Sequence, residues 1–181
     1  MRLWSESRNG TLHVVRYHDL TEMPCSITRP LVVLGDRWTF LLVKQAFTGT
    51  RRFEDLRAAL GISRSRLADR LERLVGEGIL TREPYKTDAG RGREEYRLTD
   101  KGLALYPVLI ALRDWGDRYM APDGPPAYYR HRDCGGDAHV HIVCDVCGGE
   151  LSAQDVSPEP GPGMTAPGQC DRPAGASRQS R

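Results

Sequence analysis

The stretch GISRSRLADRLERLVGEGIL, residues 61–80, constrains the fold most, because its apolar and basic residues repeat with the period of a helix. At about 100° per residue, one face of this helix is apolar and consists of Leu67, Leu71, Leu74 and Val75. A narrow stripe well away from that face is basic and consists of Arg66, Arg70 and Arg73. We therefore expect the apolar face to lie in a core and the arginines to point outward together.

Two interpretations of the basic stripe are open. A charge stripe is most often a solvated surface, and the acids that could pair with this one are Asp69, Glu72 and Glu77. The flanking sequence favours a DNA-binding helix instead, because a short helix over residues 51–60 ends at Gly61 and a tight turn, LGIS, follows it. Ser63 then suits the N-cap of the basic helix. This order of helix, turn and second helix is typical of a helix-turn-helix.

A strand, a glycine-containing polar loop and a returning strand are expected after the basic helix. The strands lie in ILTREPYK (79–86) and EEYRLTD (94–100), with TDAGRGR between them. This hairpin predicts a winged helix-turn-helix, so the fold class is mainly α with a small β-hairpin wing (α+β). Arginine and serine can bond with base edges in the major groove, and arginine beside glycine can reach phosphates or a narrow minor groove. The candidate DNA contacts are Ser63, Arg64, Ser65, Arg66, Arg70, Arg73, Arg91 and Arg93.

Two further helices are expected before the helix-turn-helix. SITRPLVVLG, residues 26–35, is a short helix that its final glycine ends. Asp36 is then the N-cap of RWTFLLVKQAF, residues 37–47. The nearly continuous apolar content of this second helix predicts that it is buried, with Trp38 in the core.

The last helix predicts a symmetric dimer. A cap at Thr99 or Asp100 starts it, it runs to Met120, and its apolar residues spread nearly all the way round the axis. One side can pack on its own domain, whereas the rest needs a cover, either a second copy or the C-terminal part of the same chain. We favour a homodimer that sets two basic helices about 34 to 36 Å apart on an inverted repeat in double-stranded DNA. The expected interface consists of Leu105, Val108, Leu109, Leu112 and Trp115.

Residues 25–120 resemble the HxlR-type winged-helix transcription regulators of bacteria, which are MarR-like. The residues that carry the resemblance are Cys25, the run LGDRWTFLL, RRF followed by DL, GIS with Leu67, Arg70 and Leu71, and EYRLTDKG with Leu105 and Trp115. The resemblance implies a homodimer that binds an operator near its target promoter as repressor or activator, and we expect a repressor. The family often has proline or lysine near positions 64 to 66, where this chain has Arg64 and Arg66, so the operator sequence does not carry over.

Cys25 is a candidate redox sensor. It lies at the start of the first helix, where backbone amides and the helix dipole can lower the pKa of a thiol. A small buried cysteine that only packs is the alternative. Some HxlR-type proteins sense oxidants or electrophiles through a cysteine matching Cys25. The resemblance therefore adds an alternative function, a sensor in which Cys25 or the metal site described next controls DNA binding.

Residues 131–149, HRDCGGDAHVHIVCDVCGG, contain an H-x2-C unit and a C-x2-C unit, each followed by Gly-Gly. Two such units supply the ligands of a tetrahedral zinc site, in which Zn2+ is structural because no position stays open for water. The candidate ligands are His131, Cys134, Cys144 and Cys147. His139 and His141 alternate on an expected short strand, AHVHIV, and either could replace His131. A redox-active pair of Cys144 and Cys147, a surface disulfide and unliganded thiols are the alternatives.

Shifts in composition divide the chain into segments. Beyond the domain at 25–120, they are an N-terminal extension (1–24), a Pro-rich linker (121–130), a zinc-ribbon-like module (131–156) and a disordered tail (157–181). The polar start and the lack of roughly 18 consecutive apolar residues predict a cytoplasmic protein without a membrane partner.

Composition also bears on the function classes. The net charge of +2 is too small to indicate a polyanionic partner, and 5 cysteines, an odd number, argue against a disulfide framework. The sequence has no Gly-rich phosphate loop, nucleophile elbow, carboxylate pair or open metal site, so we expect no enzyme. It does not define a small-molecule effector.

Overall fold

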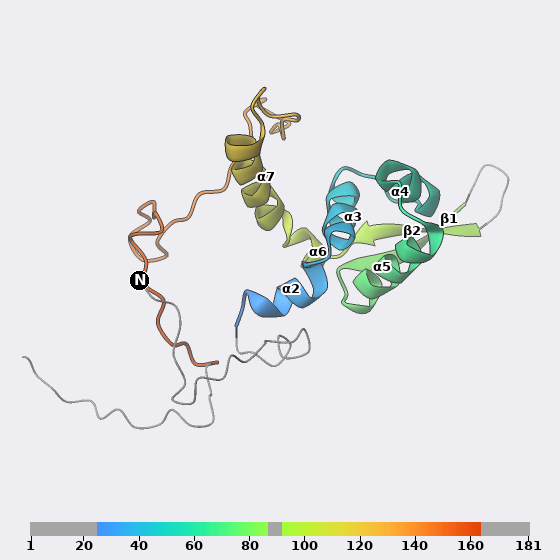
Figure 1. Cartoon of the computed structure of the whole chain (residues 1–181), viewed down its shortest axis with the longest axis horizontal. Coiled ribbons are helices and arrows are strands. Elements are labelled where there is room, and N and C mark those ends of the chain that lie inside the picture. Colours follow the sequence, from blue (N-terminus) through green and yellow to red (C-terminus); the bar gives the residue numbers. More distant parts are fainter. Residues whose placement is uncertain (1–24, 87–91, 164–181) are drawn as a thin grey trace, which may run out of the picture.

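The computed structural model describes residues 25–86 and 92–163, and Figure 1 shows how the elements are arranged. The helices and strands are α2 (Thr28–Leu34), α3 (Arg37–Phe47), α4 (Phe53–Leu60), α5 (Arg64–Gly76), β1 (Leu80–Lys86), β2 (Gly92–Leu98), α6 (Asp100–Leu103) and α7 (Tyr106–Met120). Their order and the two-stranded sheet confirm the predicted winged helix-turn-helix. The predicted N-terminal extension, residues 1–24, lies outside the described residues.

The core forms where α3, α4 and α5 meet the first strand. Leu67, Leu71 and Leu74 are each 0% exposed, so the predicted apolar face of the basic helix is confirmed. They cluster with Leu42, Val43, Leu56, Ile62, Ile79 and Leu80. Because burying one leucine side chain contributes about 1.5–3 kcal/mol, this face fixes which side of α5 remains outside.

Asp36 is the N-cap of α3, as predicted. Its Oδ1 accepts hydrogen bonds from the backbone amides of Trp38 and Thr39, both at 3.1 Å. Thr39 is fully buried, but Trp38 is only half-buried against the core and Leu41 is exposed. Helix α3 is therefore less buried than its apolar sequence predicts, and Trp38 lies at the edge of the core rather than inside it.

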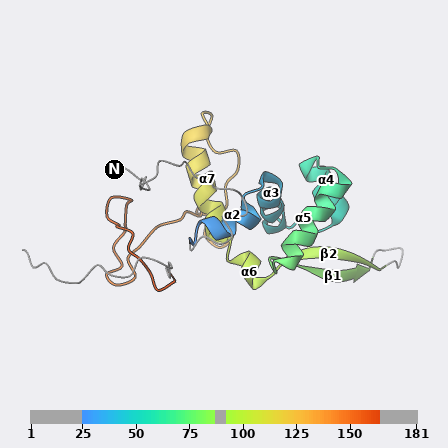
Figure 2. The ribbon, with the colours of Figure 1, turned by 60° about the horizontal axis from the view of Figure 1, so that its bottom comes forward.

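The hairpin of β1 and β2 is antiparallel, with Leu80 opposite Leu98 at the end nearest the core. Residues 51–52, just before α4, also pair with β2, because the amide of Tyr96 donates to the carbonyl of Arg51 at 2.8 Å. The sequence did not predict this pairing, since so short a segment shows no alternation. In Figure 2 the hairpin lies beneath α5, so the wing and this helix share one side of the molecule.

The predicted last helix is divided into α6 and α7. The hydroxyl of Thr99 accepts a hydrogen bond from the amide of Gly102 (3.1 Å) and caps α6, as predicted. A continuous helix cannot pass Pro107, which has no amide proton and would clash with the carbonyl of Leu103. The prediction of one helix from the Thr99 cap to Met120 is therefore wrong.

The chain beyond α7 contains no helix or strand among residues 121–163, only turns and isolated bridges. The predicted strand AHVHIV (138–143) is therefore wrong. The predicted linker 121–130 overlaps the next unit, because the amide of Ala138 donates to the carbonyl of Tyr129 (3.0 Å). Of the predicted tail, residues 157–163 are exposed and irregular, and 164–181 lie outside the described residues. No helix in the described ranges is long and apolar enough to cross a bilayer.

Candidate nucleic-acid interface and metal ligands

The first turn of α5 presents a row of exposed polar side chains, namely Ser63, Arg64, Ser65 and Arg66. Ser63 occupies the N-cap position, but its hydroxyl makes no capping bond and lies 3.5 Å from the hydroxyl of Ser65. Arg66 makes no hydrogen bond or ion pair with any residue that the structure describes. Ser63, Ser65 and Arg66 can therefore bond with a ligand without giving up an ion pair that holds the fold.

Arg64 is held by α4. Its guanidinium forms an ion pair with Glu54 and lies over the ring of Phe53, 5.3 Å from the ring centroid. Glu54 is also paired with Arg57 at 2.9 Å, and the hydrogen bond from Arg57, with the charge of Arg64, lowers the pKa of the Glu54 carboxyl. Glu54 therefore keeps a partner when Arg64 turns to another anion.

Arg70 and Arg73 do not point outward, which corrects the prediction for these two residues. The Nε of Arg70 lies 3.0 Å from Oδ1 of Asp36, and this hydrogen bond lowers the pKa of the Asp36 carboxyl. Arg73 donates to the carbonyl oxygen of Val32 in α2 at 2.5 Å. Both side chains are half-buried, because their long aliphatic chains reach across to the neighbouring helices. They hold α5 against α2 and α3.

The wing adds further basic groups. Arg93 is exposed on β2 opposite Tyr85, whereas Arg91 lies outside the described residues. The surface between the wing and the start of α5 is hollowed, with a volume of about 320 Å³. Its lining consists of Arg52, Phe53, Glu54, Asp55, Arg64, Tyr85, Arg93 and Glu94. The guanidinium of Arg52 lies 4.7 Å from the ring centroid of Tyr85. The hollow is therefore lined by both signs of charge, with three arginines and three carboxylates.

An apolar face is exposed on α7. The predicted interface residues in it, each about half exposed, are Val108, Leu112 and Trp115. Leu109 is only 6% exposed and Leu105 is half-buried against the core. Leu109 packs within its own chain, so the prediction that it lies in the dimer interface is wrong. Ile27 and Leu31 near and on α2 add further exposed apolar surface.

A groove of about 730 Å³ lies between α2, α3 and the start of α7. It is lined by Ser26, Ile27, Pro30, Leu31, Leu34, Gly35, Arg37, Phe40, Leu41, Leu105, Val108 and Leu112. The groove thus joins the exposed apolar residues of α2 and α7 into one surface. In both Figure 1 and Figure 2, α7 projects away from the helix-turn-helix. Contiguous apolar surface of this kind is typical of a protein–protein contact.

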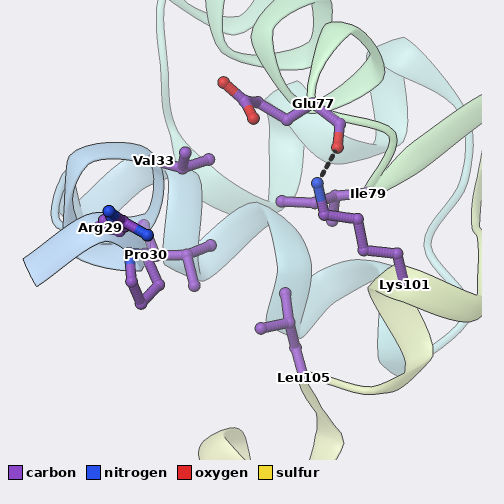
Figure 3. Close-up of a pocket in the computed structure, with 8 residues that line it drawn as sticks. Arg29, Pro30, Val33, Glu77, Ile79, Lys101 and Leu105 are labelled. Carbon is purple, nitrogen blue, oxygen red and sulfur yellow. Dashed lines mark hydrogen bonds between the residues drawn. The ribbon is translucent and has the colours of Figure 1, made fainter. Parts of the chain in front are cut away.

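A smaller pocket of about 240 Å³ shares Pro30, Leu34 and Leu105 with this groove (Figure 3). At its edge the Nζ of Lys101 donates to the carbonyl oxygen of Glu77 at 2.5 Å. Glu77 is the C-cap of α5, so the lysine satisfies a carbonyl that the helix end leaves without an intrahelical partner. The contact ties α6 to the end of the basic helix.

Cys25 lies just before α2 and is half-buried. The hydroxyl of Thr28 donates to its sulfur, as do the amides of Thr28 and Ile27, and these bonds lower the pKa of the thiol. A lowered pKa is the shift predicted for a cysteine at the start of a helix. The next residues, Ser26 and Ile27, line the apolar groove, so the thiol is close to its edge.

The H-x2-C unit folds as a tight turn, which we call the first knuckle (residues 131–136). The amide of His131 donates to the carbonyl of Gly136 (2.7 Å), and the amide of Gly135 donates back to the carbonyl of His131 (2.8 Å). Gly135 has φ 72°, a left-handed conformation that favours glycine. The Nδ1 of His131 lies 3.2 Å from the sulfur of Cys134, so the predicted ligands of this unit lie together.

The C-x2-C unit forms the same turn, which we call the second knuckle (residues 144–149). The amide of Cys144 donates to the carbonyl of Gly149, and the amide of Gly148 donates back to the carbonyl of Cys144, both at 2.9 Å. Gly148 has φ 70°. The backbone of the two knuckles is therefore equivalent, residue for residue.

The sulfurs of the second knuckle also lie together. The amides of Cys147 and Val146 and the thiol of Cys147 hydrogen-bond with the sulfur of Cys144 and lower its pKa. The described cysteines are all free thiols. Within the described ranges, however, no group of three or more His, Cys, Asp or Glu side chains is close enough to hold a metal ion. The structure therefore forms each predicted ligand pair but does not bring the two pairs to one point.

Arg113 on α7 anchors the first knuckle, a role that the sequence did not predict. Its guanidinium donates to Asp137 (3.1 Å) and to the carbonyl of Ala138, and its side chain is only 10% exposed. The adjacent Asp114 accepts a hydrogen bond from the amide of Val140 (3.2 Å). These partners are 24 to 26 positions apart in the sequence, so no local pattern indicates them.

A helix-turn-helix whose second helix presents an exposed polar first turn, followed by a wing, defines a winged-helix protein of the kind found in transcription regulators. The comparisons with known proteins identify the family. Residues 33–124 match the HxlR-like helix-turn-helix family. The chain belongs to this family, which consists of transcriptional regulators.

Relatives and solved structures agree with this assignment. The HTH-type transcriptional regulator Rv3095 of Mycobacterium tuberculosis is 45% identical over 142 residues, which cover 78% of this chain and 89% of that protein. The crystal structure of PA1607, described as a transcription factor, is 37% identical with a TM-score of 0.70 and covers 77% of this chain and 96% of its own. PA1374 of Pseudomonas aeruginosa is 30% identical with a TM-score of 0.53, covering 76% and 93%.

Proposed function

We propose that the protein is a homodimeric, sequence-specific DNA-binding repressor whose α5 enters the major groove. The observation that carries the proposal is the first turn of α5, where Arg66 has no partner among the described residues while the leucine face of the same helix is fully buried. Arginine can donate two hydrogen bonds to guanine, and serine can bond with several bases. Arg64 and Arg93 supply phosphate contacts, whereas Arg70 and Arg73 position the helix.

The dimer forms through the exposed face of α7 and the groove beside α2. A two-fold axis lets one patch serve both subunits, because each copy contributes the same residues to the other. Leu112 and Trp115, both more than half exposed, lie in this contact. Such a pair sets its two α5 helices about 34 to 36 Å apart and so binds an inverted repeat.

Selection of duplexes from a random pool by the full-length protein tests the proposal. We expect an enriched inverted repeat with half-site centres roughly 10 base pairs apart. Arg66→Ala should lose about 1 to 3 kcal/mol of binding free energy toward the selected duplex. Arg132→Ala removes the same charge from an exposed position on the first knuckle and should bind like the wild type. Absence of any enriched sequence, or equal losses in the two variants, would contradict the proposal.

The direction of regulation has its own test. A dimer on an operator that overlaps a promoter excludes the polymerase, so transcription in vitro from such a promoter should fall as the protein is added. A rise in transcript would replace the repressor with an activator and leave the DNA-binding proposal intact.

A second candidate function is control of this binding by Cys25. Its lowered thiol pKa and its place beside the apolar groove support the candidate, because a group added to the sulfur would enter the proposed dimer contact. Treatment with iodoacetamide, in which the thiolate displaces iodide, should weaken operator binding of the wild type and leave Cys25→Ser unaffected. Equal loss in both proteins would exclude Cys25 as the sensing residue.

A further inference from the structure

The two knuckles are the part of the molecule that regulation of transcription does not explain. Both lie beyond residue 124, where the match to the family ends. Each repeats the same pair of backbone hydrogen bonds, and each has a left-handed glycine directly after its second ligand residue. In each, a Cβ added to the following glycine would lie 3.4 Å from the cysteine sulfur, so both sulfurs are packed in the same way against the turn. Two equivalent turns indicate one shared task.

The side chains that the knuckles present are ligands for a thiophilic ion. The first knuckle pairs an imidazole nitrogen with a thiol, and the second pairs two thiols. Cysteine sulfur and histidine nitrogen, four in all, make the usual ligand set of a structural zinc ion. Backbone amides directed at a sulfur, as at Cys144, also satisfy the charge that a metal-bound thiolate retains.

The choice among the histidines follows from their contacts. His139 lies 3.2 Å from Asp114 on α7, and His141 lies 2.6 Å from Glu150. His131 also has a carboxylate 3.6 Å from its Nε2, that of Asp133, but among these three histidines it alone directs a ring nitrogen, Nδ1, at a cysteine sulfur. His131 is therefore the histidine that we choose as the fourth ligand of the proposed site.

The segment that carries the knuckles lacks the packing that would otherwise hold it. No described residue between 121 and 163 is buried, and Val146, Ile142 and Val143 are 90%, 64% and 57% exposed. A module this small needs a metal or disulfides to compensate for the missing core, and its cysteines are free thiols. An ion that joins the knuckles supplies this cross-link.

We propose that His131, Cys134, Cys144 and Cys147 of one chain hold one structural Zn2+ ion, which joins the second knuckle to the first. The first knuckle is fixed on α7 by Arg113, so the second knuckle is the one that moves. Residues 137–140 are held on α7 by Arg113 and Asp114, so residues 141–143, which form neither helix nor strand, are the part of the connection that can bend. The proposal does not depend on DNA binding.

Elemental analysis of the full-length protein, purified without chelator or metal-affinity resin, tests this proposal. We expect about one zinc ion per chain. Cys144→Ser and Cys147→Ser should each lose the zinc, whereas Cys25→Ser, which removes a thiol outside the knuckles, should keep it. His131→Ala should bind zinc at least tenfold more weakly than His139→Ala. Replacement of zinc by Co2+ should give the absorption of a tetrahedral ion with thiolate ligands.

Several outcomes would overturn the proposal. Zinc well below one per chain, with the knuckle thiols freely reactive toward a thiol reagent, means that the site does not exist. Equal effects of the two histidine variants would exclude His131 as a ligand. The dimer variant Leu112→Glu separates a site within one chain from a site shared between two chains. Retention of zinc by the monomeric variant supports the proposal, and loss of zinc on conversion to monomer contradicts it.

Discussion

The winged-helix body, residues 25–120, and the C-terminal segment, residues 121–163, are held together by different interactions. The body buries a contiguous set of leucine, isoleucine and valine side chains, and the leucines of α5 are 0% exposed. The C-terminal segment has no buried residue among those described and relies on turn hydrogen bonds and on Arg113. The body therefore folds by burial, whereas the segment lacks a core, and we propose DNA binding for the first and metal binding for the second.

The largest expected effect is the response of the two regions to metal removal. A zinc chelator should abolish the protection of residues 141–156 against hydrogen–deuterium exchange, because the second knuckle has no core to replace the ion. The protection of α3 and α5 should stay unchanged, since their core lies in the body. Loss of protection throughout the body on chelation would show that the regions are not independent.

The second largest effect is expected when a charge replaces an exposed apolar residue in each of the two regions. Leu112→Glu places a charge in the proposed α7 contact and should raise the dimer dissociation constant on the order of 100-fold, because an unpaired charge is costly to bury. Val146→Glu changes an exposed apolar residue of the second knuckle in the same way and should leave the dimer intact. Sedimentation velocity at several concentrations measures both. A dimer that survives Leu112→Glu and dissociates with Val146→Glu would move the interface to the segment.

The third effect, a loss of unfolding free energy, is expected from a substitution at Gly102, where the body is closely packed. A Cβ there would lie 2.3 Å from the carbonyl oxygen of Ile79 and 2.9 Å from the side chain of Leu98. Gly102→Ala should therefore cost about 1 to 3 kcal/mol of unfolding free energy in urea. Gly116→Ala is the control, because nothing lies within 4 Å of that position in α7. It should be neutral or stabilising by up to about 1 kcal/mol, and an equal loss would refute the packing argument.

The smallest expected effect concerns the Asp36 cap and its bond to Arg70. Asp36→Ala loses both the cap and the ion pair and should cost about 1 to 2 kcal/mol. Asp36→Asn can retain the cap and should cost less. Because Arg70 lowers the folded-state pKa of Asp36 below its ordinary value of 3.8, the contribution of this charge is present at neutral pH. The gap between wild type and Asp36→Asn should therefore shrink as the pH falls below about 4, and a constant gap would exclude the ion pair.

The sequence predicted what depends on local periodicity and capping. The leucine spacing of α5, the Asp36 cap and the left-handed Gly61 after α4 all agree with the structure. Each depends on residues within a few positions of one another, so the sequence contains the whole signal. The break at Pro107 was also visible in the sequence, but the apolar pattern on both sides of it favoured one long helix.

Contacts between distant segments could not be predicted in this way. Arg70 reaches Asp36, 34 positions earlier, and this contact links α5 to the start of α3. Arg113 reaches Asp137 in the same manner, and its sequence neighbours do not reveal that partner. A helical wheel gives the direction of each side chain but not the helix that lies beside it.

The central claim is that Arg66 in the first turn of α5 binds a base. The affinity of the wild type and of Arg66→Ala should be measured for the selected operator and for a set of duplexes that each replace one base pair symmetrically in both half-sites. We predict that the wild type loses about 1 to 3 kcal/mol at one G·C pair per half-site, that Arg66→Ala no longer distinguishes that pair, and that its other preferences remain. A variant that keeps every base-pair preference of the wild type, at the same magnitude, would contradict the account.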